Sequence, residues 1–250
     1  MSTSKPVKLR HIVPNLVTVF ALCVGLTSLR MSMSGNLELA LYLIVLATFL
    51  DAADGKLARF LDTASPFGAE LDSLSDFFNF GIAPGVLIFN AFYADTPNAN
   101  IGWLGCLALA VACALRLARF NLGLTDTKVS AKQSDYFVGV PAPALACLAL
   151  LPAYLYLVGW WAADQYLGIA ALYMVGTAAL AISTLPTYSI KHASVPRRHL
   201  PLVIGGSMAT VVLLVSYPWQ TLILADLAYL ISIPFAVAQY KRDHTEDTPE

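Results

Sequence analysis

The sequence predicts an all-α fold, a polytopic membrane bundle of about eight transmembrane helices, on three observations. The 250 residues are 58% hydrophobic and only 12% charged, whereas a soluble domain carries about 25% charged residues. The mean hydropathy is +0.67. Apolar stretches of about 20 residues, the length that crosses the hydrocarbon core, recur along almost the whole chain. No basic tract of the kind that binds nucleic acid is present.

The expected spans follow one another with short connections. They cover residues 13–31, 37–60, 70–93, 101–121, 140–160, 166–186, 200–217 and 219–238. We expect the first to be a retained helix and not a cleaved signal peptide, because its apolar run is long and no small-residue cleavage site follows it. Only the letters "SYPWQ" separate the last two, so a single re-entrant pair is an open alternative there.

The basic residues predict the orientation, since Lys and Arg concentrate in cytoplasmic segments. An even number of spans with the amino terminus inside leaves only Arg30 on the far side. The residues placed inside are Lys5, Lys8, Arg10, Lys56, Arg59, Arg116, Arg119, Lys128, Lys132, Lys191, Arg197, Arg198, Lys241 and Arg242. We therefore expect both termini in the cytoplasm and the protein in the cytoplasmic (inner) membrane.

Acidic residues concentrate in "FLDAADGKLARFLDTASPFGAELDSLSDFF", residues 49–78. Asp51 and Asp54 are three positions apart and Asp72 and Asp76 are four apart, so each pair shares one face of a helix. The polar connection between them contains Pro66 and permits an antiparallel hairpin. We therefore expect four carboxylates from neighbouring helices to converge near the cytoplasmic surface.

Such a cluster needs a cation, because each ionisable group at membrane depth costs about 2.5–3.5 kcal/mol. Carboxylates without Cys or His nearby suit Mg²⁺ or Mn²⁺. Arg59, one turn after Gly55, adds a fork of donors and so indicates a phosphate or diphosphate site. For the small residues Gly55, Ala58 and Gly68, simple helix packing is the alternative interpretation.

These residues resemble the signature of the CDP-alcohol phosphotransferases, without departure at any position. The matching residues are Asp51, Asp54, Gly55, Ala58, Arg59, Gly68, Asp72 and Asp76. The resemblance implies a membrane enzyme that moves a phosphoryl-linked group from a cytidine diphosphate alcohol to an acceptor hydroxyl and releases CMP. It also implies a homodimer, and a core over residues 13–190 with additional helices over 200–238, all within one membrane domain of 1–250.

The resemblance implies a role for each residue of the signature. Asp51, Asp54 and Asp72 would bind two divalent ions, with Asp76 at the same metals and acting as the catalytic general base. The remaining positions, Gly55, Ala58, Arg59 and Gly68, would line the pocket for the CDP-lipid. In "PNLVT", Asn15 and Thr18 resemble a family element beside the cytidine, although a simple helix start after Pro14 explains that segment equally well.

The acceptor is indicated by segments outside the signature. The stretches "GAELDSLSDFFNFGIAPG", "ALRLARFN" and "YFVGVPAPALA" resemble the phosphatidylserine synthases of this family, which implies CDP-diacylglycerol and L-serine as substrates. A serine carboxylate needs a cation, and Arg116 and Arg119, with Asn121, lie at the cytoplasmic end of the fourth span. The alternative for the two arginines is a basic flank that reaches lipid headgroups.

Two other functions remain open at this stage. The same chemistry can use choline, glycerol 3-phosphate or an inositol phosphate as the acceptor, although a phosphorylated acceptor calls for a larger basic cluster. A divalent-cation transporter is a remote alternative. Its polar groups would be distributed through the membrane depth, whereas these acids gather at one end.

Overall fold

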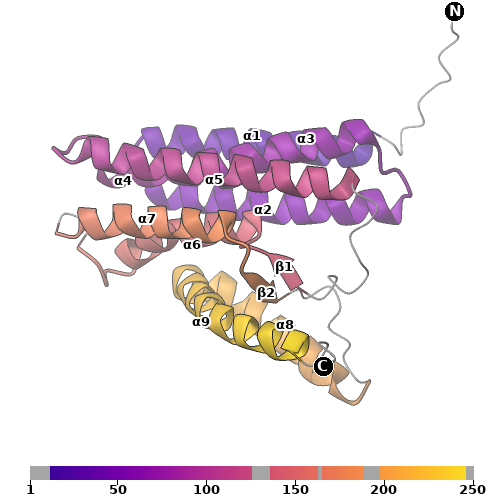
Figure 1. Ribbon diagram of the computed structural model, residues 1–250. Helices are drawn as coiled ribbons and strands as arrows, with labels where there is room; N and C mark the ends of the chain where they lie inside the picture. The colour runs from indigo at the N-terminus through magenta and orange to yellow at the C-terminus, as the bar shows by residue number, and fades with distance from the viewer. Residues whose placement is uncertain (1–11, 126–135, 163–164, 189–196, 246–250) are drawn as a thin grey trace, which may run out of the picture.

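The computed structural model describes residues 12–125, 136–162, 165–188 and 197–245 as a bundle of helices (Figure 1). The helices are α1 (Val13–Met33), α2 (Leu37–Phe60), α3 (Pro66–Asp76), the π-helical η2 (Phe77–Ile82), α4 (Ala83–Phe92), α5 (Ala99–Thr125), α6 (Ala142–Leu157), α7 (Leu167–Ile182), the 3₁₀ turn η5 (Arg197–His199), α8 (Leu200–Ser216) and α9 (Pro218–Thr245). Two short strands are β1 (Tyr136–Val138) and β2 (Pro186–Tyr188). Each expected span thus coincides with a helical segment.

The composition of these helices confirms a polytopic helical membrane protein. In the described part of the chain, four segments are long and apolar enough to cross a membrane: Val13–Met33, Pro66–Phe92, Ala99–Gly123 and Pro218–Tyr240. The helices α6, α7 and α8 are apolar but shorter, and α2 has the length but carries charged residues. The predicted orientation of the termini stays a prediction, and Lys5, Lys8, Arg10, Lys128, Lys132 and Lys191 lie outside the described residues.

The connection between α2 and α3 contains residues that typically end one helix and begin the next. Asp62 has a φ of 51°, which lets the chain reverse just after α2. Ser65 then caps α3, since its hydroxyl oxygen accepts a hydrogen bond of 3.0 Å from the Gly68 N–H. Pro66 occupies the first turn, where its missing N–H costs nothing. Both helices pack against α1.

The third span is interrupted by η2, directly after Asp76. In this wider turn the Ala83 N–H donates to the Phe78 carbonyl, five residues earlier. Pro84 follows and has no N–H to donate to the helical ladder. Gly81 lies so close to α5 that a Cβ there would be 2.7 Å from the Cβ of Cys113. The interruption therefore coincides with a close helix approach.

A short antiparallel ladder joins the segment before α6 to the segment after α7. Its register pairs Tyr136 with Tyr188, Phe137 with Thr187 and Val138 with Pro186. These strands were not predicted from the sequence. They link the last helix to the fourth span, because Arg119 of α5 donates to the Val138 carbonyl of β1 and α9 packs on β2.

The buried core is apolar and is shared by most of the helices. Its largest fully buried side chains include Leu41, Ile44, Phe80, Leu87, Leu109, Leu145, Tyr154 and Met174. The hairpin of α8 and α9 lies at an angle to the long helices in Figure 1. None of the residues of α8 is buried, whereas α9 packs on α6 and β2. The two arrangements predicted for this hairpin, a pair of spans and a re-entrant pair, both stay predictions.

Candidate active site

Three carboxylates meet between α2 and α3. One oxygen each of Asp51, Asp72 and Asp76 lies within 4.8 Å of the other two, and all three side chains are half-buried. The spacing of Asp72 and Asp76 places both on the face of α3 that meets Asp51. This is the geometry of a cluster that can hold a divalent metal ion through oxygen ligands.

Asp54 lies beside this cluster and is anchored from another helix. Its side chain is only 3% exposed, and its Oδ2 accepts a hydrogen bond of 2.6 Å from the Thr18 hydroxyl of α1. Its Oδ1 is buried and has no hydrogen-bond partner among the described residues, and the same holds for Oδ1 of Asp76. Buried carboxylate oxygens without partners are costly, so a bound cation would satisfy them. The donor set therefore fits a divalent ion.

An open pocket of about 180 Å³ adjoins the carboxylates. Its lining includes all six residues that the sequence predicts for the CDP-lipid: Asn15, Thr18, Gly55, Ala58, Arg59 and Gly68. Asp54 and Asp72 also line it. Because these residues come from α1, α2 and α3, the pocket forms only when the first three helices pack together.

The two glycines of the pocket differ in what surrounds them. A Cβ at Gly68 would lie 2.9 Å from Oδ1 of Asn15 and 3.1 Å from Oγ of Ser65, so this glycine makes room for two side chains of the pocket lining. A Cβ at Gly55 would meet nothing within 4 Å, so packing does not require a glycine there. The backbone at Gly55 is instead exposed to the pocket.

Arg59 supplies the positive charge of the pocket. Its Nε donates a hydrogen bond of 2.9 Å to the Gly55 carbonyl, which fixes the base of the guanidinium. The two terminal nitrogens have no hydrogen-bond partner among the described residues. They remain available for an anion, as a fork of two donors.

The three residues predicted for the acceptor lie in different environments. Arg116 is within electrostatic range of Asp76, and its Nε is buried without a partner. The guanidinium of Arg119 is engaged by backbone carbonyls instead, at 2.9 Å from Ile182 O and 3.2 Å from Val138 O. Asn121 donates to the hydroxyl of Ser73, between Asp72 and Asp76, at 3.2 Å. The structure thus brings Arg116 to the acids and uses Arg119 to join chain segments.

The buried polar residues that flank Asp76 in the chain, Ser75 and Asn79, were not predicted from the sequence. Asn79, fully buried in η2, donates a hydrogen bond of 3.2 Å to the buried Ser75 hydroxyl. A Cβ at Gly25 of α1 would overlap Oδ1 of Asn79, so the glycine makes room for this amide. The signal was present, since Ser75 and Asn79 are polar residues four apart in an apolar span.

The fold and the site define an integral membrane protein whose cluster of carboxylates can hold a divalent metal beside a pocket for an anionic ligand. The comparison with known families agrees, because the sequence model of the CDP-alcohol phosphatidyltransferases matches residues 11–185. The chain belongs to that family.

Several curated proteins are similar to the chain over much of its length. A protein of Mycobacterium leprae is 36% identical over 94% of this chain and 79% of its own. A protein of Mycobacterium tuberculosis is 33% identical over 91% of this chain and 78% of its own, and one of Helicobacter pylori is 36% identical over 58% of this chain and 59% of its own. All three are named CDP-diacylglycerol–serine O-phosphatidyltransferase.

Proposed function

We propose that this protein transfers the phosphatidyl group of CDP-diacylglycerol to the hydroxyl of L-serine, which yields phosphatidylserine and CMP. The observation that carries this proposal is the meeting of Asp51, Asp72 and Asp76 at a pocket lined by the rest of the signature. The names of the similar proteins, which cover most of this chain, support serine as the acceptor.

The four aspartates have complementary roles in the proposed mechanism. Asp51, Asp54, Asp72 and Asp76 would hold two divalent ions, Mg²⁺ or Mn²⁺, which would supply positive charge to neutralise the diphosphate and the departing CMP. Asp76 removes the proton of the serine hydroxyl. The serine oxygen then forms a bond to the phosphorus that carries diacylglycerol, while the bond from that phosphorus to the CMP oxygen breaks. No covalent enzyme intermediate is needed.

The pocket residues hold the nucleotide end of the donor. Arg59 presents its terminal nitrogens to the diphosphate as paired donors. The open space at Gly55 lets the ligand approach the backbone closely, and Asn15 lies on the α1 side of the pocket, where an amide can pair with the cytosine. Thr18 has a second role here, because its hydroxyl orients Asp54.

Arg116 is the proposed anchor of the acceptor. Its guanidinium lies near Asp76, so a serine carboxylate bound to it would place the serine hydroxyl at the general base. Arg119 and Asn121 would support the position of Arg116 indirectly. Arg119 joins α5 to the end of α7 through the Ile182 carbonyl, and Asn121 donates a hydrogen bond to Ser73 of α3. Arg116 is therefore the direct contact to the acceptor in this proposal.

The cellular setting follows from the predicted orientation. We propose that the protein resides in the cytoplasmic membrane as a homodimer, with the active site facing the cytoplasm. The core would span residues 13–190 and the helices over 200–238 would be an addition to it. Both substrates would then reach the pocket from the membrane surface, serine from the water and CDP-diacylglycerol from the lipid.

An acceptor panel tests this proposal. Purified protein in detergent receives CDP-diacylglycerol and Mg²⁺ or Mn²⁺, and CMP release is measured with L-serine, glycerol 3-phosphate, choline or myo-inositol 1-phosphate. We expect metal-dependent release with serine alone. Release with another acceptor would contradict the serine assignment, and no release with any of them would favour the transport alternative.

A further inference from the structure

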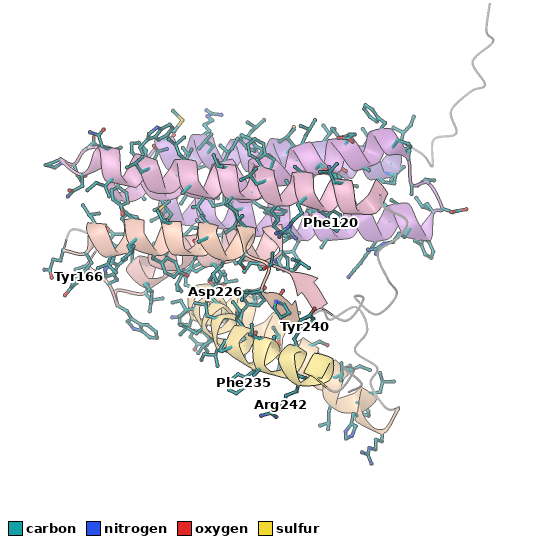
Figure 2. The ribbon with its side chains drawn as sticks, viewed as in Figure 1. Phe120, Tyr166, Asp226, Phe235, Tyr240 and Arg242 are labelled. Carbon is teal, nitrogen blue, oxygen red and sulfur yellow. The ribbon has the colours of Figure 1, made fainter. Side chains whose placement is uncertain are left out.

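The last helix reaches the acceptor side of the site although it lies beyond the segment matched by the family. That segment ends at residue 185, whereas α9 begins at Pro218. Nevertheless α9 packs on β2 and α6. Figure 2 shows Asp226 on the side of α9 that faces the bundle, with Phe235 and Arg242 on the opposite side.

The face of α9 that points into the protein is identified by buried residues that recur with the period of a helix. Trp219, Ile223, Asp226, Ile233 and Ala236 are buried, three to seven positions apart. Tyr229 lies on this face, one turn after Asp226, and packs against the core. The hydroxyl of Tyr229 therefore points into the protein and not toward lipid.

The surroundings of the Tyr229 hydroxyl are polar. Its oxygen is buried and has no hydrogen bond of good geometry, but it lies close to Thr187 of β2 and within electrostatic range of Arg116. The Thr187 hydroxyl donates to the Gly139 carbonyl at 2.9 Å, so toward Tyr229 its oxygen can only act as an acceptor. Because no hydrogen bond of good geometry joins the two hydroxyls, the Tyr229 proton is available beside the proposed acceptor anchor.

Three buried atoms thus follow one another from the metal cluster to α9, and none has a hydrogen-bond partner in the part of the chain that the structure describes: Oδ1 of Asp76, Nε of Arg116 and the hydroxyl oxygen of Tyr229. Arg116 interacts electrostatically with both of the others. A buried donor or acceptor left unpaired costs free energy, so this row suits a small ligand with several polar groups. Serine has a hydroxyl for Asp76 and a carboxylate for the two donors.

We infer that Tyr229 is a specificity-determining residue of the acceptor pocket, where its hydroxyl donates a hydrogen bond to the acceptor carboxylate held by Arg116. This inference rests on the proposed function. The ladder of β1 and β2, which Arg119 ties to α5, positions α9 for this contact. A pocket built with two donors for a carboxylate rejects an acceptor that lacks one, because both donors would be left unpaired.

The test is Tyr229→Phe, which removes only the hydroxyl. We expect the KM for serine to rise about tenfold, the size of one lost hydrogen bond to a charged group. The kcat, the KM for CDP-diacylglycerol and the Tm should change little. The matched control is Tyr154→Phe, because that hydroxyl is also buried and unpartnered but interacts with Asp226 and not with Arg116. The control should leave the KM for serine unchanged.

Equilibrium binding of radiolabelled serine to the protein with CMP and Mg²⁺ gives a readout independent of turnover, and Tyr229→Phe should weaken it similarly. An unchanged KM and affinity for serine would overturn the inference, as would equal losses in both variants. If the wild type uses another acceptor, the proposed function fails. In that case a raised KM for that acceptor in Tyr229→Phe would still place Tyr229 in the acceptor pocket. An unchanged KM for that acceptor would overturn the inference as well.

Discussion

The hydroxyl of Thr18 lies 2.6 Å from Oδ2 of Asp54 and so joins the first span to the acidic residues of the second. The same hydroxyl lies 3.2 Å from the Pro14 carbonyl within α1. A hydroxyl has one proton, and the ionised carboxylate is the stronger acceptor. This contact fixes one oxygen of Asp54 and leaves the other for a metal ion. Thr18 is thus a support of the metal site as well as a lining residue of the pocket.

Replacing Thr18 by Val removes that support. We expect the Mg²⁺ concentration for half-maximal activity to rise about tenfold or more, the usual effect of losing a group that orients a metal ligand. Thr18→Ser keeps the hydroxyl and should resemble the wild type. A matched control is Thr27→Val, because the Thr27 hydroxyl donates to the Cys23 carbonyl within the same helix. An unchanged metal dependence in Thr18→Val would show that Asp54 does not depend on this bond.

Replacing Gly55 by Ala separates packing from ligand binding. The added methyl group meets no protein atom within 4 Å, and alanine favours a helix by about 1 kcal/mol over glycine. We expect an unchanged or higher Tm with a raised KM for CDP-diacylglycerol. Gly123→Ala, also in open helical surroundings, should raise neither KM. A lower Tm with unchanged kinetics would instead assign Gly55 to helix packing.

Replacing Asp76 by Asn removes the proposed base while keeping the shape of the side chain. We expect turnover to fall at least a hundredfold, because general base catalysis contributes about 10²–10⁴ in rate. Binding of CDP-diacylglycerol, measured directly, should stay close to that of the wild type, since the pocket lining does not include Asp76. Near-normal turnover would mean that another group accepts the proton.

The two arginines of α5 should respond differently to substitution. Arg116→Lys loses the paired donors and should raise the KM for serine with little change in Tm. Arg119→Ala leaves the carbonyls of Val138, Ile182 and Ser183 without their donor, which we expect to cost about 2 kcal/mol and lower the Tm by several degrees. Thermal unfolding and serine kinetics of both variants distinguish these roles; the reverse pattern would make Arg119 the acceptor contact.

The hairpin of α2 and α3 was predictable because its determinants are local. The spacing of the acids, the polar connection and Pro66 are all visible in residues 51–76. The interruption at η2 was not predictable in the same way, because it coincides with the contact between Gly81 and Cys113 of another helix. Helical periodicity alone predicts one continuous span there.

The role of Arg119 was also not predictable from the local sequence. Its basic charge at the end of a span predicted a headgroup or acceptor contact, but its partners lie at Val138 and at Ile182, far along the chain. No spacing rule reports such pairs. The strands β1 and β2 have three residues each and were missed for a related reason, since the partner strand follows two helices later.

The most direct test of the account is the dependence of phosphatidylserine formation on a divalent metal. Purified protein is stripped with a chelator, supplied with CDP-diacylglycerol and labelled serine, and titrated with Mg²⁺ or Mn²⁺ while labelled lipid is extracted. We predict no labelled phosphatidylserine before the metal is added, recovery on addition, and no recovery in Asp76→Asn. Formation of labelled phosphatidylserine by the stripped protein would contradict the account.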